Sequence, residues 1–180
     1  MWFLAPKRRI VAGVFAAALG LSSPALCADD IPPNDLHAIV NALGFLNGLP
    51  HGAPITVGVV FGADNKAAAQ TAAALDAMPG PAQSSFKTVV IAAKDLGHAP
   101  AHLDAAIIMP DASAQAALVA DAARHRKLVT VATDPSCLEQ DACVLLVRSG
   151  ARVHIVLDTQ LAGAVGANFS SVFTMMVERK

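Results

Sequence analysis

Two cysteines near the end of the chain, Cys137 and Cys143, are the residues whose type and spacing most clearly permit chemistry. A thiol pair this close can form a disulfide, sense redox conditions or contribute to a metal site. Two cysteines alone make a poor metal site, and no histidine stands near them at zinc-finger spacing. In an exported protein, a structural disulfide between Cys137 and Cys143 is the first interpretation, and a redox-sensing pair is the alternative.

His98 and His102 form a second candidate group, because histidines four residues apart on a helix present both imidazoles to one metal ion. Pro100 lies between them and Gly97 precedes them, and both residue types disfavour a helix at this point. We therefore interpret the two histidines as solvated loop residues, and the sequence predicts no metal site there.

The segment 61–66 is predicted to join a strand to the start of a helix, and the backbone N–H groups of such a turn can bind an anion. It contains one glycine, Gly62, and matches neither the P-loop nor the dinucleotide-binding pattern. An ordinary turn is the preferred interpretation. A ligand bound there would also meet the loops that hold Asp111 and Asp134, at the carboxyl ends of the strands.

Ser170 and Ser171 lack the Gly-x-Ser-x-Gly context of a nucleophile elbow, and no Ser-His-Asp arrangement stands out in the sequence. The sequence therefore predicts no catalytic residues, no cofactor and no metal ligands. We expect a protein that is not an enzyme.

Hydrophobic periodicity and turn residues predict the elements that position these side chains. Helices are expected over residues 34–49, 66–78, 114–126 and 158–166, and over a last segment that contains Val172, Phe173, Met176 and Val177. Strands are expected over residues 55–61, 88–92, 105–109, 128–132, 144–147 and 153–157. The expected N-caps are Asn34, Asp64 and either Asp111 or Ser113.

Strands mostly alternate with helices up to residue 132, which implies right-handed crossovers and a mainly parallel sheet. The pair Ser149-Gly150 between two β-branched runs then predicts a tight antiparallel hairpin. The expected fold class is therefore α/β. We predict a three-layer sandwich in which a mixed, mainly parallel sheet has helices on both faces and a C-terminal antiparallel hairpin.

Residues 1–28 have the pattern of a secretory signal peptide. Three basic residues and no acid occur in 1–9, an uncharged apolar run fills 10–21, and small residues precede a predicted cleavage near Cys27-Ala28. The apolar run is short for a membrane span. We expect a periplasmic protein; an uncleaved anchor, acylation of Cys27 and a twin-arginine signal are the alternatives.

Removal of this segment leaves ten basic and 14 acidic residues, a net charge of −4. A mildly acidic chain argues against nucleic-acid binding, which favours a basic face. We expect no nucleic-acid partner.

The segments 144–158 and 166–171 resemble the YfiR-like (YfiR/HmsC) family, in which a hairpin ends in Phe-Glu-Ile-Asn and an Ile-Ser-Ser-x-Leu-Leu stretch follows. Here Ile155-Val-Leu-Asp158 stands in the first position and Phe169-Ser-Ser171 in the second. The segment Phe45-Leu-Asn-Gly-Leu-Pro50 is similar to the family's Phe-x-x-Trp-Pro. The chain departs from these motifs at Val156, Asp158 and Leu49, where the family has Glu, Asn and Trp.

The resemblance covers residues 29–180 as a single YfiR-like α/β domain. It implies a non-enzymatic periplasmic regulator that binds the periplasmic domain of an inner-membrane diguanylate cyclase, represses it, and so restrains cyclic di-GMP and biofilm formation. Some family members form dimers and respond to disulfide state, so a homodimer is a further expectation. The alternative function is a periplasmic small-ligand binding protein associated with transport.

Overall fold

The computed structural model describes residues 30–99 and 102–180. The expected signal peptide at residues 1–28, with its cleavage near Cys27-Ala28, lies outside these described residues. Within them the chain forms seven strands, which are β1 (Ile55–Phe61), β2 (Phe86–Ala92), β3 (Ala105–Ile108), β4 (Val129–Ala132), β5 (Leu145–Arg148), β6 (His154–Leu157) and β7 (Glu178–Arg179).

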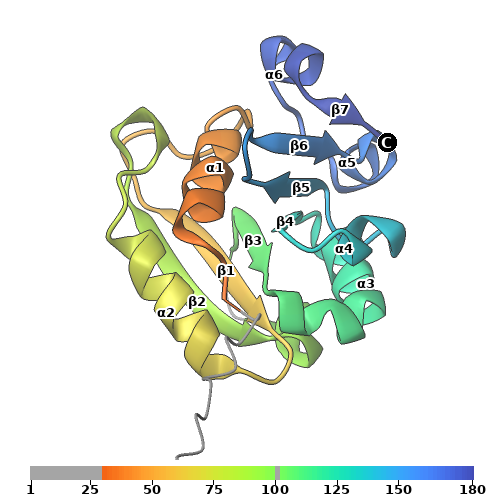
Figure 1. Ribbon diagram of the computed structural model, residues 1–180. Helices are drawn as coiled ribbons and strands as arrows, with labels where there is room; N and C mark the ends of the chain where they lie inside the picture. Colours follow the sequence, from red (N-terminus) through yellow and green to blue (C-terminus); the bar gives the residue numbers. More distant parts are fainter. Residues whose placement is uncertain (1–29, 100–101) are drawn as a thin grey trace, which may run out of the picture.

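The strands form one sheet in the order β2-β1-β3-β4-β5-β6-β7 (Figure 1). β1 pairs in parallel with β2 on one side and with β3 on the other, and β4 and β5 continue the parallel run. β6 returns antiparallel to β5, and β7 lies parallel to β6. This is the mixed, mainly parallel sheet with an antiparallel hairpin that the sequence predicts.

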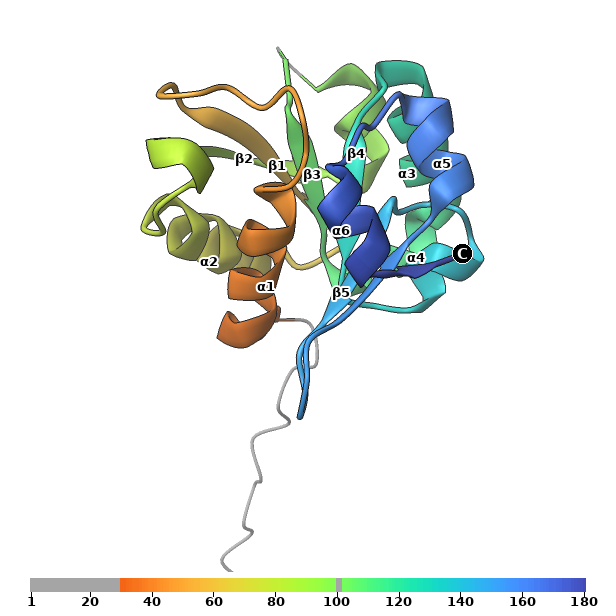
Figure 2. The ribbon, with the colours of Figure 1, turned by 90° about the horizontal axis from the view of Figure 1, so that it is seen from above.

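Helices pack on both faces of this sheet. The α-helices are α1 (Pro33–Leu43), α2 (Asn65–Asp76), α3 (Ala116–Arg126), α4 (Ser136–Glu139), α5 (Thr159–Val165) and α6 (Ser171–Met176). Three short 3-10 helices are η1 (Pro81–Gln83), η2 (Ala93–His98) and η3 (Pro110–Gln115). Figure 2 shows α1 and α2 on one side of the sheet and α3 on the other.

The core is divided in two by the sheet, because successive side chains of a strand point to opposite faces. In β1, Val57 and Val59 belong to the core cluster that includes residues of α1, α2, α5 and α6, whereas Val60 belongs to the cluster that includes residues of η2, α3 and α4. β3 and β4 are buried along their whole length, as expected for strands covered on both faces. The predicted three-layer α/β sandwich is confirmed.

Some helix boundaries differ from the predicted ones because tertiary contacts replace local caps. α2 begins as predicted, with the Asp64 carboxylate accepting hydrogen bonds from the backbone N–H groups of the first turn. α1 has no side-chain cap and ends at Leu43, not at residue 49, since Leu46 instead pairs with Phe169. α3 begins after η3, and neither Asp111 nor Ser113 caps it.

The C-terminal hairpin is wider than predicted. Its register pairs Arg148 with His154, so the loop spans residues 149–153 and is not a two-residue turn. The backbone N–H of Ser149 donates a hydrogen bond to the Asp35 carboxylate, which fixes the loop to α1. The short elements α4 and β7 were not predicted, because four and two residues are too few to show a periodicity.

Candidate functional site

The turn between β1 and α2 binds a carboxylate that the protein itself supplies. The backbone N–H groups of Gly62, Ala63 and Asp64 donate to Oδ2 of Asp111, over 3.0, 2.7 and 2.8 Å. A Cβ atom at Gly62 would lie 2.3 Å from the backbone oxygen of Asp111, so only glycine permits this approach. An external anion would have to displace Asp111 from the turn.

The ionised form of Asp111 is the one that this arrangement favours. Partial burial raises the pKa of Asp111, but the hydrogen bonds from the backbone of Asp64, Ala63 and Gly62 together outweigh it and lower the pKa below its ordinary value of 3.8. The Asp111 carboxylate is therefore ionised at neutral pH and serves as an acceptor within the fold.

The loop after β4 holds a second carboxylate in a similar way. Asp134 forms a hydrogen bond with the Ser113 hydroxyl and accepts another from the backbone N–H of Ser136 over 3.0 Å. Burial raises the pKa of Asp134, whereas these bonds and the charge of Arg148 lower it. The loops after β1, β3 and β4 thus meet as the sequence predicts, but their carboxylates bind neighbouring protein groups.

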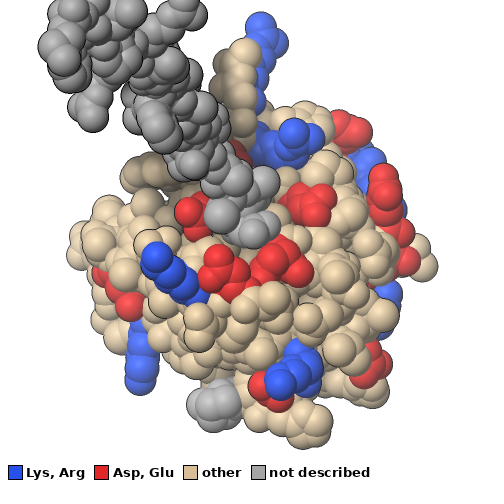
Figure 3. Space-filling model, turned by 60° about the horizontal axis from the view of Figure 1, so that its bottom comes forward, with Lys and Arg blue, Asp and Glu red and all other residues tan. Residues whose placement is uncertain are grey.

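The loops at this end of the molecule carry Asp64, Asp111 and Asp134. Figure 3 shows carboxylate side chains gathered near the centre of this face. Both carboxylates hold neighbouring loops together. Because Asp111 binds the turn after β1 and Ser113 binds Asp134, neither Asp111 nor Ser113 caps α3.

His98 and His102 do not converge on a common ligand. His98 ends η2, and His102 Nε2 lies 3.0 Å from Oδ1 of Asp104. Both imidazoles are exposed, as predicted for loop histidines. Across residues 30–99 and 102–180, no three His, Cys, Asp or Glu side chains gather as the ligands of a metal ion.

The disulfide predicted between Cys137 and Cys143 is not formed: both residues are free thiols, and both are buried. Cys137 lies in α4, and the backbone N–H of Ala142 donates to its carbonyl oxygen over 2.9 Å, which folds the intervening loop. A hydrogen bond with Cys137 raises the pKa of the Cys143 thiol, and burial raises it further. Both sulfurs are buried, and the raised pKa of Cys143 keeps that thiol protonated and poorly reactive.

Ser170 and Ser171 have a structural function at the start of α6. Ser170 Oγ accepts a hydrogen bond from the backbone N–H of Phe173 over 3.3 Å and so caps the helix. The backbone N–H of Ser170 donates to the carbonyl oxygen of Phe45 over 2.9 Å. These two contacts fix the start of α6 against the loop after α1.

The segments 45–50 and 166–171, which carry the family resemblance, meet at the start of α6. Phe169 forms an isolated antiparallel bridge with Leu46. The ring of Phe173 stacks between them, with centroids 5.1 Å from Phe45 and 5.2 Å from Phe169. An aromatic cluster therefore joins the loop after α1 to the C-terminal segment.

α6 buries one side chain and exposes the rest of its apolar residues. Phe173 is 1% exposed, whereas Val172, Met175 and Met176 are 54%, 78% and 64% exposed. We call these three side chains the α6 surface. The sequence predicted a last helix that contains Val172, Phe173, Met176 and Val177, but not which of these side chains are exposed. Apolar residues on all sides of a short helix were the available signal.

No protein-family model matches this chain, and no curated protein matches it either. Among the described residues, no helix is long and apolar enough to cross a membrane. The function therefore has to be inferred from the residues and their contacts.

Proposed function

We propose that this protein is a non-enzymatic periplasmic regulator that binds an inner-membrane diguanylate cyclase through the α6 surface and represses it. The observation that carries the proposal is the exposure of Val172, Met175 and Met176 on one short helix. A group of exposed apolar side chains marks an interaction site, and methionine side chains adapt to the shape of a partner. Repression would lower cyclic di-GMP and restrain biofilm formation.

The α6 surface is held in place before any partner binds. Ser170 caps the helix, Phe173 anchors it between Phe45 and Phe169, and β7 follows it directly. A surface that is already ordered loses little conformational entropy on association, which favours binding.

The identity of the partner comes from the family resemblance, and two of the three departures from the family motifs, Val156 and Asp158, have structural roles of their own. Val156 is 7% exposed and packs in the core with α3 and α4. Asp158 accepts a hydrogen bond from the backbone N–H of Leu161 over 2.7 Å and so caps α5, a function that Asn also performs. Neither Val156 nor Asp158 is one of the three side chains of the α6 surface, so these two departures leave its composition unchanged.

The occupied carboxyl edge of the sheet supports a function other than catalysis. Open α/β sheets bind substrates and ligands outside the carboxyl ends of their strands. Here Asp111 fills the turn after β1, and Asp134 bonds to Ser113 and Ser136. The alternative function, a transport-associated binding protein, would hold its ligand at this edge of the sheet. Because protein groups already occupy the edge, we favour the regulator over this alternative.

Deletion of the gene tests the proposal. We expect cellular cyclic di-GMP and biofilm mass to rise, and expression of the wild-type protein to restore both. Unchanged cyclic di-GMP, in cells that express a diguanylate cyclase with a periplasmic domain from a neighbouring gene, would contradict the regulator.

Expression of variants in the deletion strain then tests whether repression depends on the α6 surface or is lost on any surface substitution. Met175→Glu places a charge on the α6 surface and should fail to restore cyclic di-GMP. Leu118→Glu, at a side chain of α3 that is 52% exposed, should restore it as the wild type does.

A further inference from the structure

We propose that a cavity between α1 and α2 binds a small organic cation with an apolar tail, of the class of aliphatic primary amines. The cavity has a volume of about 370 Å³, within the range of small-ligand sites. Its walls come from the start of α1 and from one side of α2. The lining residues are Asp30, Ile31, Pro32, Pro33, Leu36, Gln70, Thr71, Ala74 and Met78.

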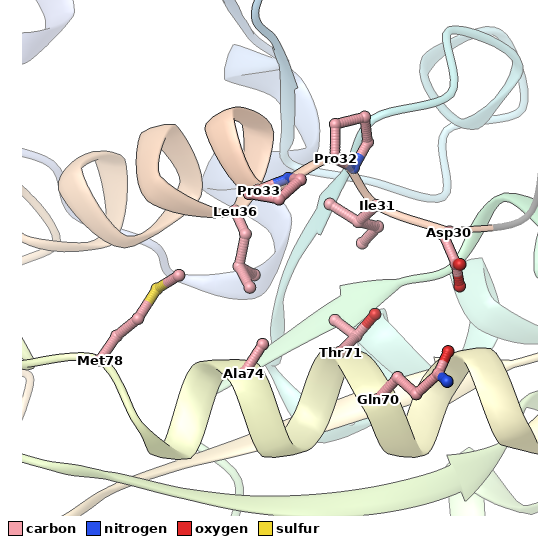
Figure 4. Close-up of a pocket in the computed structure, with 9 residues that line it drawn as sticks. All are labelled: Asp30, Ile31, Pro32, Pro33, Leu36, Gln70, Thr71, Ala74 and Met78. Carbon is pink, nitrogen blue, oxygen red and sulfur yellow. The ribbon is translucent and has the colours of Figure 1, made fainter.

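The cavity has one apolar end and one polar end (Figure 4). Met78 lies at the first, Leu36 and Ala74 follow, and Asp30 and Gln70 lie together at the second. Leu36 is 3% exposed, so this wall belongs to the core. An elongated ligand would therefore place an apolar chain toward Met78 and a polar group toward Asp30.

The polar end has hydrogen-bonding groups that the protein leaves unused. In the described part of the chain, the side chains of Asp30, Gln70 and Thr71 form no hydrogen bond with another protein group. Thr71 is only 6% exposed. A ligand that carries a hydrogen-bond donor would find acceptors there that no protein donor occupies.

The charge of the lining selects a cation. Asp30 is the one charged residue among the lining residues, and no Lys, Arg or His occurs there. An ammonium group can donate to the Asp30 carboxylate, the Gln70 amide oxygen and the Thr71 hydroxyl at once. A carboxylate or phosphate ligand would be repelled by Asp30.

This site is independent of the α6 surface, because the two share no residue. Loss of amine binding would leave the regulator proposal untouched, and loss of cyclase binding would leave the amine site untouched.

Titration of the purified protein with n-hexylammonium chloride, followed by two-dimensional NMR, tests the proposal. We expect saturable shifts confined to the start of α1 and to α2. 1-Hexanol, which has the same chain without the charge, should bind roughly tenfold more weakly, as expected for the loss of one charge-assisted hydrogen bond. Hexanoate should not bind.

Two variants and one control locate the site. Asp30→Asn should weaken hexylammonium binding roughly tenfold and leave hexanol binding unchanged. Ala74→Phe fills the cavity and should abolish binding of both. Ala73→Phe, on the neighbouring α2 residue that does not line the cavity, should bind both as the wild type does.

Three results would overturn the proposal: absence of saturable hexylammonium binding, equal binding of hexanoate, or shifts located elsewhere. Occupation of the cavity by residues 1–29 of the chain itself would also overturn it. That occupation would appear as contacts between those residues and Ala74 in the absence of amine.

Discussion

The Lys180 ammonium lies 2.8 Å from the Asp141 carboxylate and so ties the C-terminal segment to the loop between the two cysteines. The same Nζ lies 3.3 Å from Oδ2 of Asp158 and donates to the carbonyl oxygen of Leu138. Because β7 directly follows α6, this set of contacts also fixes the end of α6 relative to the sheet.

Replacement of Lys180 by methionine should loosen β7 with little effect on overall stability, because the ion pair is largely exposed. We expect faster hydrogen exchange, measured by NMR, at the backbone amides of Thr159 and Lys180. The Thr159 N–H donates to the carbonyl oxygen of Lys180, and the Lys180 N–H donates to that of Leu157. Lys87→Met, on an exposed residue of β2, is the control. Unchanged exchange at Thr159 and Lys180 would contradict the anchoring role.

The pH dependence of this anchor follows from two opposite pKa shifts. The hydrogen bond with Asp141 raises the pKa of Lys180 above 10.5, so its contribution is complete at lower pH and is lost as pH rises through the raised value. The bond to Lys180 lowers the pKa of Asp141 below 3.8, so that contribution is lost as pH falls through the lowered value. Protection of the β7 amides should therefore be flat near neutral pH and decline at both extremes.

Asp111→Ala should destabilise the fold by about 1–3 kcal/mol at pH 7, because three backbone N–H groups lose their common acceptor. Since the pKa of Asp111 is lowered in the folded state, its stabilising effect is present above its ordinary pKa of 3.8 and is lost as pH falls. Urea unfolding of both proteins at pH 7 and pH 3 measures this. An equal difference at both pH values would contradict the role of the ionised carboxylate.

Gly62→Ala and Gly163→Ala should change stability in opposite directions. A Cβ at Gly62 would meet the backbone of Asp111 and Ala112, an overlap that costs about 1–3 kcal/mol. Gly163 lies within α5 with open space around it, and alanine there should stabilise the helix by about 0.5–1 kcal/mol. Thermal unfolding compares the two. A Gly62→Ala protein as stable as the wild type would disprove the close approach.

Cys137 and Cys143 should resist thiol reagents in the native protein and react after unfolding. Both are buried, and the raised pKa of Cys143 disfavours its reactive thiolate. A protein that lacks residues 1–28, and with them Cys27, should therefore show two slow thiols in buffer and two fast ones in guanidinium chloride. No titratable thiol after unfolding without reductant would contradict the free pair.

The sequence alone was enough to predict a mixed, mainly parallel sheet and the N-cap of α2. β1 matches its predicted bounds, since an apolar run between turn residues is a local signal, and Asp64 caps α2 as its position before that helix indicates. Asp111 was placed in the correct loop, but as a helix cap. Its partners lie 47 to 49 residues earlier in the chain, and no local pattern reports such a contact.

The cysteines and α6 show where sequence patterns were insufficient. Proximity and export favoured a disulfide between Cys137 and Cys143, but the separation of the two sulfurs depends on the folded loop between them. The sequence predicted a last helix with several apolar residues but not which of them are buried. Which of its apolar residues are buried depends on the aromatic stack of Phe173 on Phe45, a residue more than a hundred positions earlier.

The affinity of the purified protein for the periplasmic domain of the neighbouring diguanylate cyclase tests the central claim most directly. Wild-type protein and Leu118→Glu should bind equally, and Met175→Glu should bind at least about tenfold more weakly, as expected for a charge placed in an apolar interface. Met175 is 78% exposed, so its substitution leaves the core intact, which circular dichroism can verify. Equal binding by Met175→Glu and the wild type, or no binding by the wild type, would contradict the account.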